Sequence, residues 1–132
     1  MEKFGKLLGT TYLFTQSEDE LPSYLIRNLQ QYVQFESKRE KFLGCCWIKN
    51  FLSKGHIFLL VTDRRIAYRD PSRIEQNLFS SITGIEQNIF KNICVHSAGN
   101  TTKIFRQSNL PSQKLLNKLF ALINTHWLSI NS

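Results

Sequence analysis

The spacing of apolar residues changes twice along this chain and divides it into three parts. Between about residues 40 and 107, apolar residues form short runs or alternate with polar ones, which is typical of β-strands. Before residue 35 and after Pro111 they recur every three or four residues, which is typical of amphipathic helices. Residues 1–16 form a short apolar, threonine-rich arm, which is either a strand of the sheet or a loosely held tail. The pattern predicts a sheet-forming segment flanked by two helices.

The middle segment predicts about seven strands. The apolar run His56–Val61 is too short for an ordinary helix and is bounded by Gly55 and Asp63. In Arg65–Arg69, Ile66 and Tyr68 share one face, and the other face is expected to be wet. Short strands separated by turn residues predict an antiparallel barrel or sandwich. The expected strands are 41–51, 56–61, 65–69, 73–79, 84–90, 92–97 and 101–106.

Each flanking helix has a start signal and an apolar stripe. Asp19 is placed to cap an N-terminal helix that runs to about Gln34, with Pro22 in its first turn. Asn109 can cap the C-terminal helix, and we expect its Trp127 to be largely buried against the sheet. The C-terminal stripe contains Leu115, Leu116, Leu119, Phe120, Leu122, Ile123 and Trp127, and the N-terminal stripe contains Leu21, Leu25, Leu29, Tyr32 and Val33.

Two segments of the middle region resemble a known family. Leu60-Val61-Thr62-Asp63 runs into Arg64-Arg65-Ile66-Ala67-Tyr68, and Ser81-Ile82-Thr83-Gly84-Ile85-Glu86 follows. In order and spacing they resemble the bacterial pleckstrin-homology-like domains. The resemblance implies a seven-stranded antiparallel barrel or sandwich, capped by a C-terminal amphipathic helix, over residues 36–130. The arm and N-terminal helix, residues 1–35, lie outside it. That family is defined by a fold and not by a reaction, so the resemblance leaves function open.

One hexapeptide occurs twice, eleven residues apart. Residues 74–79 read IEQNLF and residues 85–90 read IEQNIF. Either both strands meet the same demand, with one face buried and one solvated, or their polar residues form a recognition strip for a protein partner. The candidate strip consists of Gln76, Asn77, Gln87 and Asn88.

Net charge predicts an acidic partner without identifying its class. The chain carries 17 basic and 10 acidic residues, a net charge of +7, and no acidic residue follows Glu86. Candidate anion or lipid contacts are Lys49, Lys54, Lys103 and Arg106. Eukaryotic pleckstrin-homology domains bind phosphoinositides through a lysine on the first strand and a basic-x-arginine pattern on the second, where this chain has His56-Ile57-Phe58. Weak, diffuse attraction to anionic lipid is therefore expected, and nucleic acid is not an expected partner because the cations form no run or known motif.

Potentially reactive side chains are few and scattered. Cys45 and Cys46 should project to opposite faces of a strand, Cys94 lies in another strand, and no Cys-x-x-Cys pair occurs. The three histidines are far apart in sequence, so no local zinc ligand set can be built. We predict buried structural thiols, a cytoplasmic location, no catalytic residues, no metal and no cofactor.

These patterns predict a non-catalytic binding module that acts through protein contacts, including contacts between copies of itself. An open sheet edge in this fold can accept another strand, and the groove between a sheet edge and the C-terminal helix can accept a peptide. Surplus apolar residues in the first 34 positions favour a homo-oligomer, because large exposed apolar patches are unusual on monomers. The alternative is peripheral binding to an anionic membrane surface, at the inner face of the cell membrane.

Overall fold

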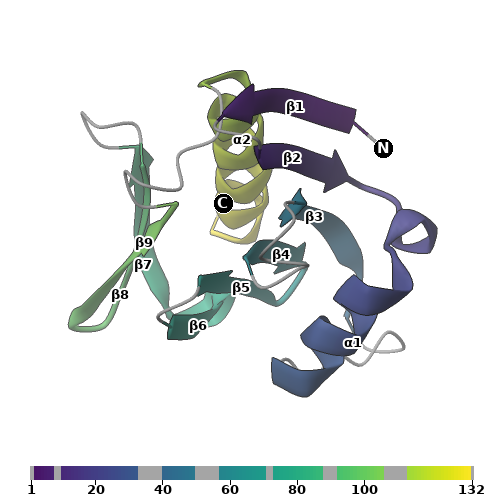
Figure 1. The fold of residues 1–132 in the computed structure, drawn as a ribbon. Coiled ribbons are helices and arrows are strands. Elements are labelled where there is room, and N and C mark those ends of the chain that lie inside the picture. Colours follow the sequence, from purple (N-terminus) through teal and green to yellow (C-terminus); the bar gives the residue numbers. More distant parts are fainter. Residues whose placement is uncertain are drawn as a thin grey trace.

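The computed structural model describes residues 2–7, 10–32, 40–49, 57–70, 73–87, 92–105 and 113–131. These residues form nine strands, two α-helices and two short 3-10 turns (Figure 1). In chain order the elements are β1 (Glu2–Leu7), β2 (Thr10–Thr15), η1 (Glu18–Glu20), α1 (Ser23–Tyr32), β3 (Phe42–Lys49), β4 (Phe58–Thr62), β5 (Arg65–Asp70), β6 (Arg73–Leu78), η2 (Phe79–Ser81), β7 (Ile82–Gln87), β8 (Ile93–Ser97), β9 (Asn100–Ile104) and α2 (Gln113–Ile130).

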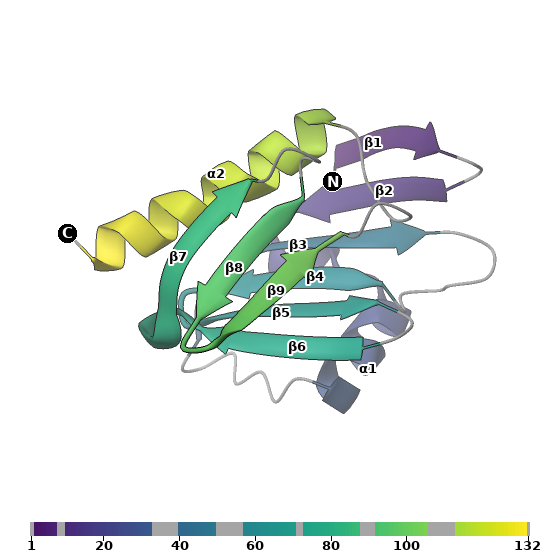
Figure 2. The same ribbon diagram turned by 90° about the vertical axis from the view of Figure 1, so that its left-hand side faces the viewer.

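The strands form two antiparallel sheets. The larger has the order β1-β2-β3-β4-β5-β6, and the smaller has the order β7-β8-β9. Figure 2 shows the small sheet in front of the large one, with α2 running beside β7 and α1 behind the large sheet. The large sheet is therefore covered on both faces, which explains why every residue of β4 is buried.

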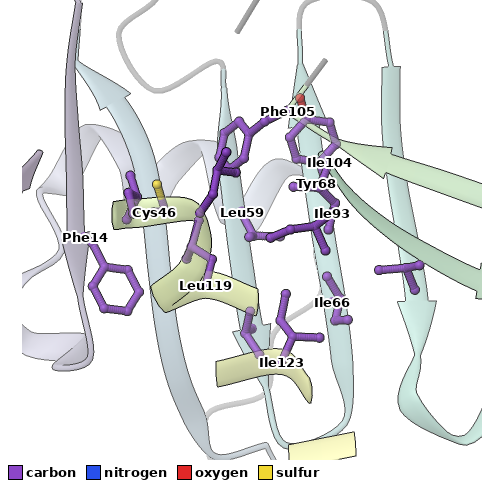
Figure 3. Close-up of a cluster of buried hydrophobic side chains, with 14 of the residues drawn as sticks. Phe14, Cys46, Leu59, Ile66, Tyr68, Ile93, Ile104, Phe105, Leu119 and Ile123 are labelled. Atoms are coloured by element: carbon purple, nitrogen blue, oxygen red, sulfur yellow. The ribbon is translucent and has the colours of Figure 1, made fainter. Parts of the chain in front are cut away.

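The main core fills the space between the two sheets and α2. Side chains from β3, β4, β5, β8 and α2 point toward one another there (Figure 3). Helix α2 contributes its apolar stripe, as the 3.6-residue period predicts. The fully buried stripe residues are Leu115, Leu116, Leu119 and Ile123, and partly buried Phe120, Leu122 and Trp127 pack against the same cluster.

A second, smaller core lies between the opposite face of the large sheet and α1. Trp47, Phe58 and Leu60 from the sheet meet Leu25 and Leu29 from the helix. Strand alternation divides adjacent residues between the two cores, so that Cys46 belongs to the main core and Cys45 to the second. Both are buried and form no disulfide, and the same holds for Cys94. This confirms the orientation predicted for the cysteine pair and the burial of all three thiols.

The prediction of a mainly β domain with antiparallel strands and a C-terminal helix is confirmed. Closure into a barrel is not observed, because β1 to β6 and β7 to β9 remain separate sheets. Seven of the nine strands lie between residues 42 and 104. The other two form a hairpin from the N-terminal arm, and β2 pairs with β3 from Thr11–Lys49 to Thr15–Cys45. The arm is thus part of the sheet. Of the two predicted alternatives, a strand of the sheet and a loosely held tail, the first is confirmed.

Helix α1 begins later than the sequence predicted. Leu21 precedes Pro22 and is extended, with φ −71° and ψ 129°, as steric contact with a following proline favours. This break leaves Asp19 in η1, so the cap predicted there is wrong. The helix starts instead with the carbonyl of Pro22, which accepts hydrogen bonds from the N–H groups of Leu25 and Ile26 at 3.0 and 3.1 Å.

Helix α1 packs two of its apolar side chains against the protein's own sheet. Leu25 and Leu29 of α1 are 0% and 6% exposed on the protein's own sheet. Ala67 of β5 is buried beneath the same helix, so the face of β5 expected to be wet is only partly so. Self-association stays a prediction, and the buried part of the apolar surface on which it was based includes β2 residues 12–14 and the two leucines of α1.

Candidate binding groove beside helix α2

An open groove of about 470 Å³ runs along one flank of α2, between the helix and strands β2 and β3. Phe14, Leu43 and Leu122 give it apolar walls, while Gln16 and Thr125 bring hydrogen-bonding groups. Its volume is within the range typical of ligand sites. The full lining is Phe14, Gln16, Leu43, Lys118, Ala121, Leu122, Thr125, His126 and Ser129.

A glycine in β3 allows α2 to approach the sheet at this groove. A Cβ atom at Gly44 would lie 2.9 Å from Leu122 Cδ2 and 3.2 Å from Phe14 Cε2, closer than ordinary van der Waals contact. The absent side chain therefore sets the distance between α2 and the sheet, and with it the width of the groove.

Both ends of the groove carry a basic side chain held by a specific contact. Lys118 Nζ lies 5.5 Å from the centroid of the Phe14 ring, within cation–π range. Near the other end, His126 Nε2–H donates a 2.8 Å hydrogen bond to the carbonyl oxygen of Asp63. The His126 ring also meets Phe79 edge to face, with 4.7 Å between centroids. The two His126 contacts hold α2 against the β4–β5 turn and η2.

Of the four predicted anion contacts, only Lys103 has a side chain within the described part of the chain. Lys103 is exposed on β9, and its carbonyl oxygen accepts a 2.6 Å hydrogen bond from Arg73 Nη2. Lys49 ends β3, and its side chain is outside the described set. Lys54 and Arg106 lie outside the described residues.

The predicted polar recognition strip is wrong for Asn77, which is buried between the two sheets at 7% exposure. Its Nδ2 donates to Thr102 Oγ1 at 3.0 Å, and its Oδ1 accepts from Ser97 Oγ at 3.2 Å. Asn77 is therefore a link between β6 and the small sheet, because a buried amide is stable only when both ends are hydrogen-bonded.

The other members of the strip do not form one surface with it. Gln76 is exposed on the opposite face of β6 and accepts a 3.0 Å hydrogen bond from Arg65 Nη1. Gln87 is turned toward α2, where its Nε2 lies 3.5 Å from Asn117 Oδ1. Asn88 lies outside the described residues.

The Thr-Asp-Arg-Arg segment that carried the family resemblance forms a hydrogen-bonded turn. Thr62 Oγ1 accepts from the N–H groups of Arg64 and Arg65 at 3.1 and 3.0 Å and donates to Glu40 Oε2 at 2.8 Å. Arg65 also forms an ion pair with Glu40, whose side chain is 4% exposed. Arg64 is exposed. The segment therefore has a structural role. The buried carboxylate that it binds, Glu40, was not predicted from the sequence.

A polar cluster on the outer face of the small sheet was also not predicted. The two ring nitrogens of His96 lie 2.8 Å from Glu86 Oε1 and 2.9 Å from Thr101 Oγ1. The side chains of His96 and Glu86 are 35% and 63% exposed, so these are cross-strand contacts at the surface. Within the described ranges, no group of three or more His, Cys, Asp or Glu residues is placed to hold a metal ion.

Sequence reasoning proposed a peptide groove beside the C-terminal helix but did not identify its residues. The signal was available in the helix itself. Ala121, Thr125 and Ser129 are small and lie four residues apart, directly beside the apolar stripe. Small side chains on one flank of a packed helix leave room between that flank and the sheet.

No family model, curated protein or solved structure matches this chain. Of the two described helices, neither has the length and apolar character needed to cross a bilayer.

Proposed function

We propose that this chain is a non-catalytic binding module with a pleckstrin-homology-like core, and that it binds an extended protein segment in the groove beside α2. The core assignment is supported by the order of elements, since strands β3 to β6 face β7 to β9 and a helix follows. This is the order expected for that superfold. The β1–β2 hairpin and α1 are additions to it.

The observation that carries the proposal is the groove's mixed lining. An extended segment needs apolar contact for its side chains and hydrogen-bond partners for its backbone. Leu43 and Leu122 supply the apolar contact. Gln16 is exposed, and its amide can both donate and accept a hydrogen bond to a bound backbone.

Filling the groove should abolish binding without unfolding the protein. Ala121 lines the groove and is exposed, so Ala121→Trp should place an indole in the groove at little cost to the fold. Linear peptides selected from a random phage-displayed library on the wild-type chain should bind this variant at least about tenfold more weakly, which fluorescence anisotropy would measure.

The matched control is Gln31→Trp. Gln31 is exposed on α1, across the large sheet from α2, so this change adds the same surface indole away from the groove. Selected peptides should bind Gln31→Trp as they bind wild type. A library that yields no binder, or binders that ignore Ala121→Trp, would contradict the proposal.

A second candidate function is contact with an anionic membrane surface, supported by apolar residues at one end of the fold. Leu78, Leu128 and Ile130 are 49%, 53% and 48% exposed. The elements that carry them meet at this end, where the N–H of Phe79 donates to the carbonyl of Arg64 at 2.8 Å and His126 contacts Asp63. Arg64 adds an exposed positive charge.

Vesicle flotation tests this second candidate. The protein should float with phosphatidylglycerol vesicles at low salt and be released near physiological salt, where the Debye length is about 8 Å. The double change Leu128→Asp with Ile130→Asp should weaken flotation more than Ile74→Asp, which alters an exposed residue at the other end of β6. Equal flotation of both variants would exclude this surface as the membrane contact.

A further inference from the structure

We infer that two copies of this chain associate through strand β6, which pairs antiparallel with β6 of the second copy about a two-fold axis at Gln76. This surface is separate from the groove beside α2, which lies at β2 and β3. It also differs from the first 34 residues, through which the sequence predicted self-association.

The two described sheets have four edges, and three of these carry features that oppose pairing with another strand. Strand β1 contains two lysines and a shift in its register with β2. Strand β7 runs beside α2 (Figure 2), where Trp127 donates to the carbonyl of Ile82. At β9, the carbonyl of Lys103 accepts a hydrogen bond from Arg73. Lysines, bulges and covering side chains or helices are the usual means by which proteins block an open sheet edge.

Strand β6, the fourth edge, has an unprotected apolar face. Ile74, Gln76 and Leu78 lie on the face away from the main core, so this face has no charged residue and no proline. Ile74 and Leu78 are two of the four large apolar side chains that are exposed in the described part of the chain. The charged residues of the other face, Arg73 and Glu75, form an ion pair with each other. An edge of this kind favours pairing with another strand.

The backbone of β6 has the phase that such pairing needs. The N–H of Phe79 donates to the carbonyl of Arg64 at 2.8 Å, which continues the β5–β6 ladder in register. Hydrogen-bonded and non-hydrogen-bonded pairs alternate along an antiparallel ladder. Leu78, in the next pair, is therefore not hydrogen-bonded to β5, and neither is Ile74, four residues earlier. The N–H and C=O groups of both residues point away from β5, toward the edge of the sheet.

An antiparallel register centred on Gln76 is self-complementary. It places Ile74 of each copy opposite Leu78 of the other, so that two apolar cross-strand pairs form. Each of these pairs can also exchange two backbone hydrogen bonds, because both partners direct their N–H and C=O groups to the edge. Contact about a two-fold axis requires such a patch, in which one surface matches itself.

This register places no like charges directly opposite each other. On the inner face, Glu75 is opposite Asn77 of the second copy. On the outer face, the β5 strands place Arg69 of one copy in line with Arg65 of the other, three strand spacings or about 14 Å apart. This distance exceeds the Debye length of about 8 Å at physiological ionic strength. Arg65 is also paired with Glu40 of its own copy.

Sedimentation equilibrium of the full chain tests the inference. At high micromolar concentration the wild-type mass should approach twice 15.4 kDa. Ile74→Lys with Leu78→Lys places lysines opposite each other across the axis and should weaken the dimer at least about tenfold. Both side chains are exposed, so the monomer should stay folded, which circular dichroism checks. A wild-type chain that stays monomeric would overturn the inference and leave the proposed groove unaffected.

A charge exchange tests the register itself. Ile74→Lys with Leu78→Glu places a lysine opposite a glutamate in both symmetric pairs. This variant should dimerise at least about tenfold more tightly than the double lysine variant, and added salt should reduce the difference. Equal association of the two variants would overturn the register.

Leu128→Lys with Ile130→Lys is the matched control. These residues are the other two exposed large apolar side chains of the described chain, and their replacement adds the same charge on α2. Leu78 also belongs to the candidate membrane surface, and this control changes the rest of that surface while β6 stays intact. The control should dimerise as wild type does. Loss of the dimer here, with retention in Ile74→Lys with Leu78→Lys, would overturn the inference.

Ile74→Pro separates backbone pairing from contact between side chains alone. Proline removes the N–H that points to the edge and costs no hydrogen bond to β5, so an edge strand tolerates it. The variant should stay folded and lose most of its association. A folded Ile74→Pro variant that dimerises as wild type does would overturn strand pairing at β6.

Discussion

The free energy of unfolding should fall steeply as the pH rises above about 9, because two adjacent thiols are buried in different cores. Burial raises the pKa of Cys46 above the ordinary value of 9.0, and burial together with the neighbouring Cys46 raises the pKa of Cys45 well above it. Above pH 9 the unfolded chain releases both protons while the folded chain retains them. Stability from these groups is thus complete below pH 9 and is lost at about 3 kcal/mol per pH unit above it.

Two tyrosines add to this loss from about pH 10. Burial, followed by the charge of Asp70, raises the pKa of Tyr68, and burial followed by Cys46 raises that of Tyr12. Against a typical stability of 5 to 15 kcal/mol, these terms are large enough to unfold the protein in mild alkali.

Denaturant unfolding curves recorded between pH 7.5 and pH 10 would measure how the free energy of unfolding changes with pH. Cys45→Ala and Cys46→Ala should each remove about half of the slope between pH 9 and pH 10, because each leaves one buried thiol. A stability that is constant to pH 10 in the wild-type chain would contradict the burial of these thiols.

The middle strands could be predicted because each has a local signal. Apolar runs and alternation indicate strands, and Asp, Gly, Ser and Asn residues mark the turns between them. The expected strand at 73–79 corresponds to β6 (Arg73–Leu78), and that at 92–97 corresponds to β8 (Ile93–Ser97). The N-terminal arm lacks such a decisive signal, since its place beside β3 depends on a partner strand far away in sequence.

Orientation within the repeated hexapeptide could not be predicted from the repeat. Ile85 packs against the main core, whereas its counterpart Ile74 is 36% exposed. Edge strand β6 instead turns Asn77 inward, where Thr102 and Ser97 satisfy its amide. The expectation that both copies bury their apolar face is therefore wrong, because tertiary neighbours decide which face of a strand is buried.

Phe105 shows a second limit of alternation. Ile104 ends β9 facing the core, so continued strand geometry would turn the next side chain outward. Phe105 has φ +57°, a left-handed conformation that bulky residues rarely adopt. Because of this backbone conformation, the Phe105 ring lies in the core, where the residue is 0% exposed and its ring centroid is 5.5 Å from that of Tyr68. Burial of a phenylalanine offsets a conformational cost of about 1 to 2 kcal/mol.

Only the approximate position of the candidate site could be predicted from the sequence, and not its residues. The order of elements led to a groove between a sheet edge and the C-terminal helix, whereas the groove lies beside β2 and β3, which are internal strands of the large sheet. Its residues depend on how α2 is rotated about its axis and on how closely it approaches the sheet. The rotation of α2 depends on stripe residues such as Trp127, whose Nε1–H donates to the carbonyl of Ile82 at 3.2 Å. Trp127 was expected to be largely buried and is only partly buried. The distance between α2 and the sheet depends on Gly44, which lies against Leu122, a residue 78 positions away in the sequence.

Arg73→Ala should destabilise the protein by about 3 to 5 kcal/mol. Arg73 Nε lies 3.6 Å from Asp70 Oδ2, and Nη1 lies 3.1 Å from Glu75 Oε1. The guanidinium also donates to the carbonyl of Lys103 and lies 5.9 Å from the Tyr68 ring centroid, so it joins the edge of the large sheet to β9. Alanine would leave the Asp70 carboxylate, whose side chain is 2% exposed, buried without the cation beside it.

Two further variants separate this ionic link from the general effect of losing an arginine. Arg64→Ala removes an exposed arginine at the opposite end of β5 and should cost less than about 0.5 kcal/mol. Arg73→Lys keeps the charge but not the planar fork that reaches two carboxylates and a carbonyl, so it should give an intermediate loss. Chemical denaturation at pH 7 measures all three, and a loss below about 1 kcal/mol for Arg73→Ala would mean that the Arg73 contacts contribute little to holding the two sheets together.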